Sequence, residues 1–163
     1  MRNLTLSRRR ALLGGAALAA LAVAGIGRAA EPTHIAITKG PNCTCCDGWA
    51  RHLREAGYSV SVVESPELSS LKARLEIPAD LRTCHTAQVG NYVLEGHVPA
   101  LAVRQLLDEK PAQVTGLAVP GMPVGSPGME ADGAEPEEYS VIVFGPTGRK
   151  IWNRFKGVTE ING

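Results

Sequence analysis

Aromatic residues are scarce in this chain of 163 residues, at 4% of its positions, although 44% of its residues are hydrophobic. The scarcity partly reflects an N-terminal segment rich in Ala, Leu and Gly. The length is sufficient for one domain with a substantial hydrophobic core. The sequence shows no internal repeat, no Gly-rich phosphate-binding loop and no nucleophile-elbow serine. It therefore lacks the common signatures of nucleotide-binding proteins and serine hydrolases.

Acidic residues are absent from residues 1–30, which hold five of the 17 basic residues. The basic run Arg8–Arg10 precedes an uncharged apolar run from Ala11 to Ile26, and small residues follow at Gly27–Ala29, as in an export signal with a cleavage site. The apolar run is short and interrupted by glycine, which disfavours a membrane span of about 20 residues. We therefore predict that residues 1–29 are an export signal peptide and that residues 30–163 form the mature domain. Arg9–Leu13 also resembles a twin-arginine export signal.

Removal of the signal changes the charge of the protein. The remaining residues include 12 basic and 16 acidic ones, a net charge of about −4. This charge argues against nucleic acid or anionic lipid as the main partner. No later segment is apolar and long enough to span a bilayer. We therefore predict a periplasmic protein that binds neither nucleic acid nor membrane once its signal is cleaved, and we expect a monomer.

Hydrophobic periodicity predicts an alternation of strands and helices. A strand at 34–38 leads into a helix that is capped by Asn42 and ends before Gly57. Further strands are expected at 58–63, 92–94, 114–119, 139–144 and 149–155, and further helices from Ser65–Pro66 to Pro78 and from Pro99 to Glu109. A strand that feeds a helix beginning with Cys-x-x-Cys predicts an α/β fold of the thioredoxin-like sandwich type. Residues 120–138 form a Gly- and Pro-rich loop whose length favours a functional role or disorder.

Three of the four cysteines, Cys43, Cys45 and Cys46, fall within four residues at the predicted helix start. Free backbone N–H groups and the positive end of the helix dipole favour thiolates there. In a redox interpretation, Cys43 is the nucleophile and Cys46 the resolving thiol. In a metal interpretation, all three thiolates bind a soft cation, above all Cu(I). The third thiol, that of Cys45, adds nothing to disulfide exchange and therefore favours the metal interpretation. A structural disulfide from Cys43 or Cys46 to Cys84 is a third alternative.

Other soft donors occur further along the chain. Cys84 and His85 lie in a polar segment from which either side chain can reach a shared site. Met122 and Met129 lie in the long loop, and we hypothesise that the loop folds over the cysteines and supplies a thioether; filling a gap in the core is the alternative role. His97 precedes Val98-Pro99 and is a candidate ligand or a hydrogen-bonded turn residue. Zinc is disfavoured, because only one dense cysteine cluster exists and Met does not suit zinc. His34 and His52 receive no role.

Five short segments in order resemble the motif set of the CopG-type periplasmic copper-resistance proteins, formerly a domain of unknown function. They are Cys43–Trp49, Thr83–Ala87, Glu95–Ala100, Gly116–Pro123 and Gly125–Glu130, and the resemblance covers roughly residues 33–157. It implies a thioredoxin-like domain with a C-terminal metal-binding extension, a cysteine-bridged and hence multinuclear copper cluster, and interconversion of Cu(I) and Cu(II) beside efflux systems. By position, the implied thiolate ligands are Cys43, Cys45, Cys46 and Cys84, while His85, His97, Met122 and Met129 lie in matching motifs.

The predicted function is copper binding in copper resistance, with redox cycling of the bound metal. One alternative is a metal-free thiol–disulfide oxidoreductase. Another is a copper chaperone that delivers the metal without redox chemistry. The expected partners are copper ions and either copper-efflux components or an electron-transfer protein. The residues leave open whether the chain is a copper oxidoreductase or a carrier.

Overall fold

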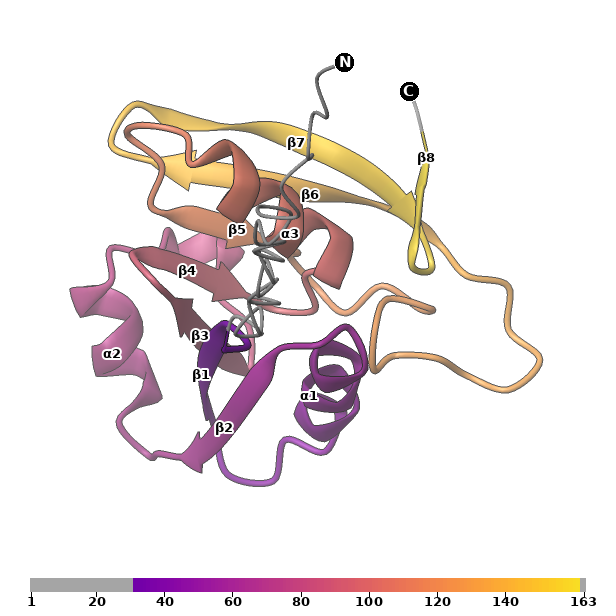
Figure 1. Cartoon of the computed structure of the whole chain (residues 1–163). Helices are drawn as coiled ribbons and strands as arrows, with labels where there is room; N and C mark the ends of the chain where they lie inside the picture. Colours follow the sequence, from indigo (N-terminus) through magenta and orange to yellow (C-terminus); the bar gives the residue numbers. More distant parts are fainter. Residues whose placement is uncertain (1–30, 162–163) are drawn as a thin grey trace, which may run out of the picture. The chain divides into compact units, whose positions relative to one another are not determined.

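Eight strands form one mixed sheet in residues 31–161, the part of the chain that this computed structural model describes (Figure 1). The predicted export signal lies outside the described residues. The strand order is β2-β1-β3-β4-β5-β6-β7-β8. The elements follow one another as β1 His34–Lys39, α1 Cys45–Glu55, β2 Ser59–Glu64, α2 Leu68–Arg74, a 3₁₀ helix Ala79–Leu81, β3 His85–Val89, β4 Tyr92–Glu95, α3 Ala100–Glu109, β5 Gly116–Ala118, β6 Glu138–Gly145, β7 Gly148–Lys156 and β8 Thr159–Ile161.

The sheet combines parallel and antiparallel strand pairs. Strands β1 and β2 are parallel and are connected through α1. Strand β3 pairs antiparallel with both β1 and β4. Strand β5 is parallel to β4, and β6, β7 and β8 then continue the sheet in antiparallel pairs. The predicted α/β class is therefore confirmed, with a mixed sheet and few helices.

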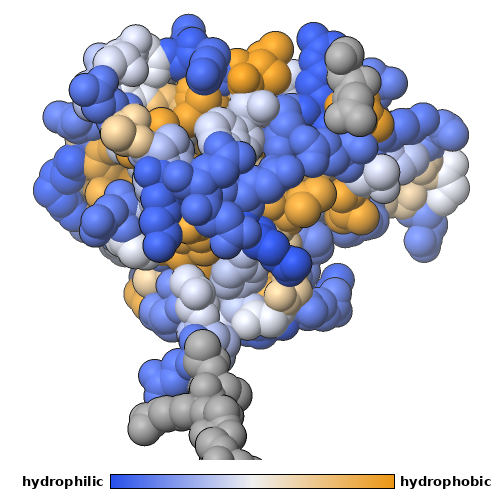
Figure 2. All heavy atoms as spheres, turned by 45° about the horizontal axis from the view of Figure 1, so that its top comes forward, coloured by the Kyte–Doolittle hydropathy of each residue, from blue (hydrophilic) through white to orange (hydrophobic). Residues whose placement is uncertain are grey.

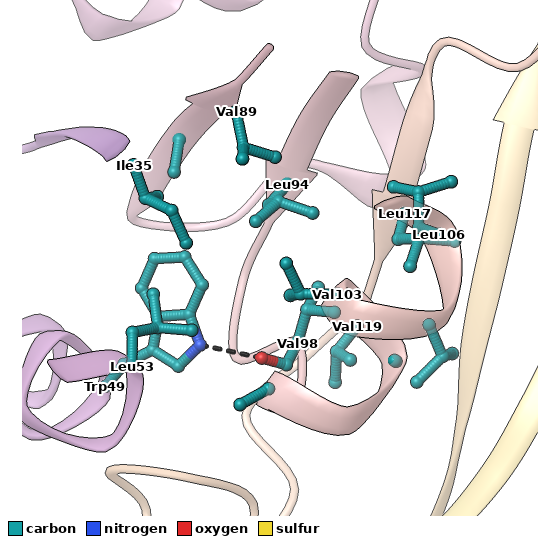
Figure 3. Packing of buried hydrophobic residues seen from close by; sticks show 14 of the residues in the cluster. Ile35, Trp49, Leu53, Val89, Leu94, Val98, Val103, Leu106, Leu117 and Val119 are labelled. Atoms are coloured by element: carbon teal, nitrogen blue, oxygen red, sulfur yellow. Dashed lines mark hydrogen bonds between the residues drawn. The ribbon is translucent and has the colours of Figure 1, made fainter. Parts of the chain in front are cut away.

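Hydrophobic residues on the two faces of the sheet form separate clusters, because successive side chains of a strand point to opposite faces. In β4, Leu94 joins the larger cluster and Val93 the smaller one. The larger cluster is the main core, where Trp49 and Leu53 of α1 and Leu106 of α3 pack on the sheet (Figure 3). The Trp49 indole Nε1–H donates to Val98 O over 2.9 Å and so ties α1 to the chain entering α3.

Two predicted helix starts are corrected by the structure. Helix α1 begins at Cys45 with Thr44 as its N-cap and no capping side chain, whereas Asn42 adopts a left-handed φ of 64° in the preceding turn. Cys43 therefore precedes the helix instead of lying in its first turn. Helix α2 begins at Leu68, because the Ser65 hydroxyl accepts a hydrogen bond from Glu67 N in a turn outside the helix.

The loop at residues 120–137 packs against the start of α1. A Cβ atom added to Gly48 would lie 2.8 Å from the Gly128 Cα, and one added to Gly128 would lie 2.5 Å from Trp49 N. Only glycine at both positions allows the two backbones to approach so closely. The loop therefore lies against the helix start that carries Cys45, while the thioether ligand that the hypothesis assigns to the loop has no part in this contact.

The surface carries single exposed hydrophobic side chains. Figure 2 shows hydrophobic residues in separate patches among hydrophilic ones on the face that it draws. Among the described residues, the large hydrophobic ones that are exposed are Val63, Leu101, Met122, Ile151 and Val158. Isolated residues of this kind are ordinary on a folded domain and do not identify an interface. Within residues 31–161, every helix is too short or too polar to cross a bilayer.

Candidate metal centre

The pairing of β1 with β3 brings the fourth cysteine to the other three. The register places Lys39, at the end of β1, opposite His85 at the start of β3. Gly40 N donates to Cys84 O over 3.0 Å and extends this pairing into the loop before α1. Cys84 therefore lies beside the Cys-x-Cys-Cys segment although about 40 residues separate them in sequence.

The sulfur of Cys84 lies at the centre of the cluster. Its distances to the sulfurs of Cys43, Cys46 and Cys45 are 2.9, 3.7 and 3.8 Å. Cys43 and Cys46 form a disulfide, while Cys45 and Cys84 are free thiols with partly exposed side chains. The bridge therefore has the Cys-x-x-Cys spacing of the redox interpretation and does not include Cys84.

His85 presents a nitrogen lone pair to the sulfurs. Its Nε2–H donates to Gly96 O over 2.9 Å, which leaves Nδ1 unprotonated in the neutral ring. Nδ1 lies 3.2 Å from Cys46 Sγ and 3.7 Å from Cys84 Sγ. Burial, followed by the positive charge that His97 would carry, lowers the pKa of His85 to about 3. The imidazole is therefore neutral at any physiological pH and available as a metal ligand.

His97 presents a second buried nitrogen. Its Nδ1–H donates to Pro127 O over 2.7 Å, and its Nε2 is buried without a hydrogen-bond partner. Burial lowers the pKa of His97 and keeps the ring neutral. A buried polar atom without a partner is costly. A metal ion bound at Nε2 would remove that cost.

These side chains form two overlapping groups of candidate ligands. One contains Cys84, His85 and, once their disulfide is reduced to thiolates, Cys43 and Cys46; the other contains Cys45, Cys84 and His97. Within each group the ligand atoms all lie within 4.8 Å of one another. Thiolate and imidazole donors suit soft or borderline ions such as Cu(I) and Zn²⁺. Burial, then neighbouring Cys45, raises the pKa of the Cys84 thiol to about 11, so metal binding there would release a proton.

The two methionines of the loop stand apart from this arrangement. The side chain of Met122 is 57% exposed. Met129 is partly buried in a tight turn, where its N–H donates to Ser126 O and its carbonyl oxygen accepts from Gly125 N. The loop reaches the site through Pro127 and Gly128. A thioether ligand from this loop stays a prediction.

Several residues that support the site were missed by the sequence analysis. The rings of Trp49 and His85 lie in tilted contact with centroids 4.6 Å apart, and the rings of His85 and His97 form a T-shaped contact with centroids 5.0 Å apart. Lys72 and Glu95 form a buried ion pair behind the Cys84–His85 segment. Glu95 belongs to the Glu95–Ala100 segment noted in the sequence. Nothing in the sequence indicated that Lys72 is buried, because a lysine on a helix is ordinarily exposed.

The comparisons with known proteins agree on one family. Residues 81–129 match a family described as "Protein of unknown function, DUF411". A solved structure named "Copper resistance protein copG- Form 1" is 35% identical, with a TM-score of 0.69 over 82% of this chain and 100% of that chain. A second, named "Copper resistance protein copG- Form 2", is 34% identical, with a TM-score of 0.69 over 81% of this chain and all of its own. No curated protein matches the chain. On this identity and coverage, the chain belongs to the CopG-type family of copper-resistance proteins.

Proposed function

We propose that this protein binds copper ions in copper resistance, through its Cys-x-Cys-Cys segment together with Cys84. The observation that carries the proposal is the central position of the Cys84 sulfur, which lies 2.9 to 3.8 Å from the sulfurs of the other three cysteines. The neutral His85 and the unpartnered Nε2 of His97 supply further donors at the same place. The names of the two similar structures support copper as the metal.

We further propose that the centre holds more than one copper ion. Its two ligand groups have only Cys84 in common, and a thiolate sulfur is able to bridge two metal ions. Sulfur-rich donor sets favour Cu(I) over harder ions. The loop at residues 120–137 belongs to the proposed metal-binding extension, since Pro127 O holds His97 in the tautomer that leaves Nε2 free.

The fold supports the thioredoxin-like proposal. A parallel β1–α1–β2 unit carries Cys43 and Cys46 at its helix start and is followed by the antiparallel pair β3–β4 and by α3. A Cys-x-x-Cys pair in a βαβ unit is typical of thiol redox proteins. The pair also suggests how copper would be reduced: two Cu(II) ions would each gain one electron from the Cys43 and Cys46 thiols, which would form the disulfide and release two protons.

A metal-free thiol–disulfide oxidoreductase is the second candidate, and one contact favours it. The Cys84 sulfur lies 2.9 Å from that of Cys43, so, once its thiol has lost its proton, Cys84 is placed to attack the bridge, form a bond to Cys43 and release Cys46 as a thiolate. Cys45 has no part in that exchange. A copper chaperone without redox chemistry uses the same ligands and differs only in leaving the oxidation state of the metal unchanged. Efflux components or an electron-transfer protein remain the proposed partners.

The test is elemental analysis and a visible spectrum of protein purified from copper-supplemented cells. We expect copper in excess of zinc in the wild type, and a sharp loss of copper in Cys45→Ser, because that thiol belongs to the cluster. Thr44→Ser, in the same segment, is the control and should keep its copper. Undiminished copper in Cys45→Ser would remove Cys45 from the site, and a wild type without copper would favour the metal-free oxidoreductase.

A further inference from the structure

The ion pair between Lys72 of α2 and Glu95 of β4 is almost completely withdrawn from solvent. Lys72 Nζ lies 2.6 Å from Glu95 Oε1, and the two side chains are 4% and 0% exposed. Every other ion pair in residues 31–161 has at least one well-exposed side chain. A buried pair is a poor source of stability, because removing two charges from water offsets most of their attraction. Its place in the fold therefore calls for another explanation.

The polar contacts of the pair converge on three residues of one short segment, Thr83, His85 and Thr86. Lys72 Nζ–H groups donate to His85 O over 3.0 Å and to Thr86 Oγ1 over 2.5 Å. Glu95 Oε1 accepts from the N–H and the hydroxyl of Thr83 over 2.5 and 2.9 Å. Glu95 Oε2 accepts from the Thr86 hydroxyl over 2.5 Å. The ammonium thus uses its three N–H donors, and the carboxylate binds the chain both before and after Cys84 and His85.

The end of β4 also orients the imidazole. Gly96, which follows Glu95, accepts the His85 Nε2–H and turns Nδ1 toward the sulfurs. A Cβ at Gly96 would lie 2.5 Å from Val119 O, so this carbonyl is held close to the neighbouring chain. One strand end therefore holds Thr83 and Thr86, the residues that flank Cys84 and His85, through Glu95, and the ring of His85 through Gly96. The contacts of Lys72, Glu95 and Gly96 thus position the segment that contributes the candidate ligands Cys84 and His85.

We propose that Lys72 and Glu95 are positioning residues of the metal centre, which hold Cys84 and His85 in place for the metal. The proposal rests on the proposed copper-binding function. A pair that served only to attach α2 to the sheet would be replaceable by apolar side chains. Here the hydrogen bonds run instead to the backbone and hydroxyl groups that flank two ligands. Residues that orient metal ligands typically change metal affinity 10- to 100-fold when they are replaced.

The test compares two double variants that carry the same chemical changes. Lys72→Met with Glu95→Gln removes the buried pair at nearly constant volume. Lys156→Met with Glu135→Gln removes an exposed pair, whose side chains are 43% and 86% exposed. Cu(I) affinity of the reduced proteins is measured by competition with a chromogenic chelator, beside circular dichroism, the visible spectrum of the loaded proteins and ¹⁵N NMR of the histidines in the metal-free proteins.

We expect the buried-pair variant to fold and to bind Cu(I) about 10- to 100-fold more weakly, with an altered spectrum and a mixed tautomer at His85. The exposed-pair variant should match the wild type in every readout. Glu95→Gln alone, which keeps an acceptor for Thr83 and Lys72, should show a smaller loss and serves if the double variant does not fold. A folded variant with wild-type affinity and spectrum would overturn the positioning role and leave copper binding intact. A wild type that takes up no Cu(I) would overturn the proposed function and this role together.

Discussion

At the scale of single residues, three histidines have their protonation fixed by backbone partners. Gly96 O and Pro127 O each bind one ring nitrogen of His85 and His97 and leave the other for a metal. In His52 the ring nitrogen accepts a hydrogen bond instead of donating one: its Nε2 accepts from Ala100 N–H over 3.0 Å at the start of α3. It thereby satisfies one of the free N–H groups at a helix N-terminus. The role of His52 could not be predicted from the sequence, since this contact joins residues 48 positions apart.

This contact predicts a dependence of stability on pH. Burial lowers the pKa of His52 below its ordinary value of 6.5, against the raising influence of Glu130 and Glu55. As the pH falls, His52 therefore binds its proton at a higher pH in the unfolded chain than in the folded protein. The neutral His52 therefore contributes fully to the free energy of unfolding above about pH 6.5. This contribution is lost as the pH falls through the lower pKa that His52 has in the folded protein. His85 and His97, whose pKa values are also lowered, act in the same direction.

We predict that His52→Gln, which keeps an acceptor but does not titrate, loses less stability between pH 7.5 and pH 5 than the wild type. The measurement is denaturant unfolding of both metal-free proteins at the two pH values. His52→Leu, which lacks the acceptor, should be less stable at both. Equal losses in wild type and His52→Gln would show that His52 contributes nothing to the pH dependence.

At the scale of elements, the loop at residues 120–137 and helix α1 depend on each other. Gly128 has a φ of +86° and lies against the first turn of the helix, next to the carbonyl that binds His97. A side chain there would push the loop away from α1. Gly133 of the same loop, with a φ of +76°, has nothing within 4 Å of an added Cβ.

We predict that Gly128→Ala is less stable than Gly133→Ala and binds copper more weakly. Both variants carry the strain of a positive φ, about 1 kcal/mol or somewhat more, but only Gly128→Ala adds a clash with Trp49 N and Cys45 O. Thermal unfolding and copper content of the two variants provide the measurement. Similar stability and copper content would mean that the loop tolerates displacement from the helix.

The methionines of the same loop lead to a separate prediction. Replacing Met122 and Met129 together by Leu keeps volume and apolarity nearly constant. A thioether stabilises Cu(I) over Cu(II), so the double variant should fold normally, bind Cu(I) more weakly and have a lowered copper reduction potential. The measurements are chelator competition and redox titration. Wild-type values in both would assign the methionines to packing, a result that the 57% exposure of Met122 makes informative.

At the scale of the whole molecule, the predicted export signal bears on where the protein acts. We predict cleavage close to Ala29, from the order of basic, apolar and small residues in the first 30 positions. Mass spectrometry of protein from the periplasmic fraction should show a chain that starts near Ala30 or Glu31. A full-length chain in the inner membrane would contradict both the cleavage and the periplasmic location.

Local patterns in the sequence predicted most of the elements. Strands β1, β2, β4, β6 and β7 and helix α3 lie where alternation or helical spacing placed them, because each buries one face against a common core. Strand β3 was missed: its His85 and Thr86 are polar, yet both are buried, since the strand lies between β1 and β4. Polar residues in a central strand hide the usual alternation, and their partners come from distant segments.

The sequence by itself determined the dense cysteine segment, the strand and helix that carry it, and the long loop rich in glycine and proline, because these depend on residue type and on spacing along the chain. The tertiary structure alone decided that Cys84 lies among the other three sulfurs, that the imidazoles of His85 and His97 are held in defined tautomers, and that Lys72 and Glu95 pair out of solvent. Each of these depends on strand pairing and loop packing between residues far apart in sequence. Burial then sets which nitrogen, sulfur or charge is available for chemistry.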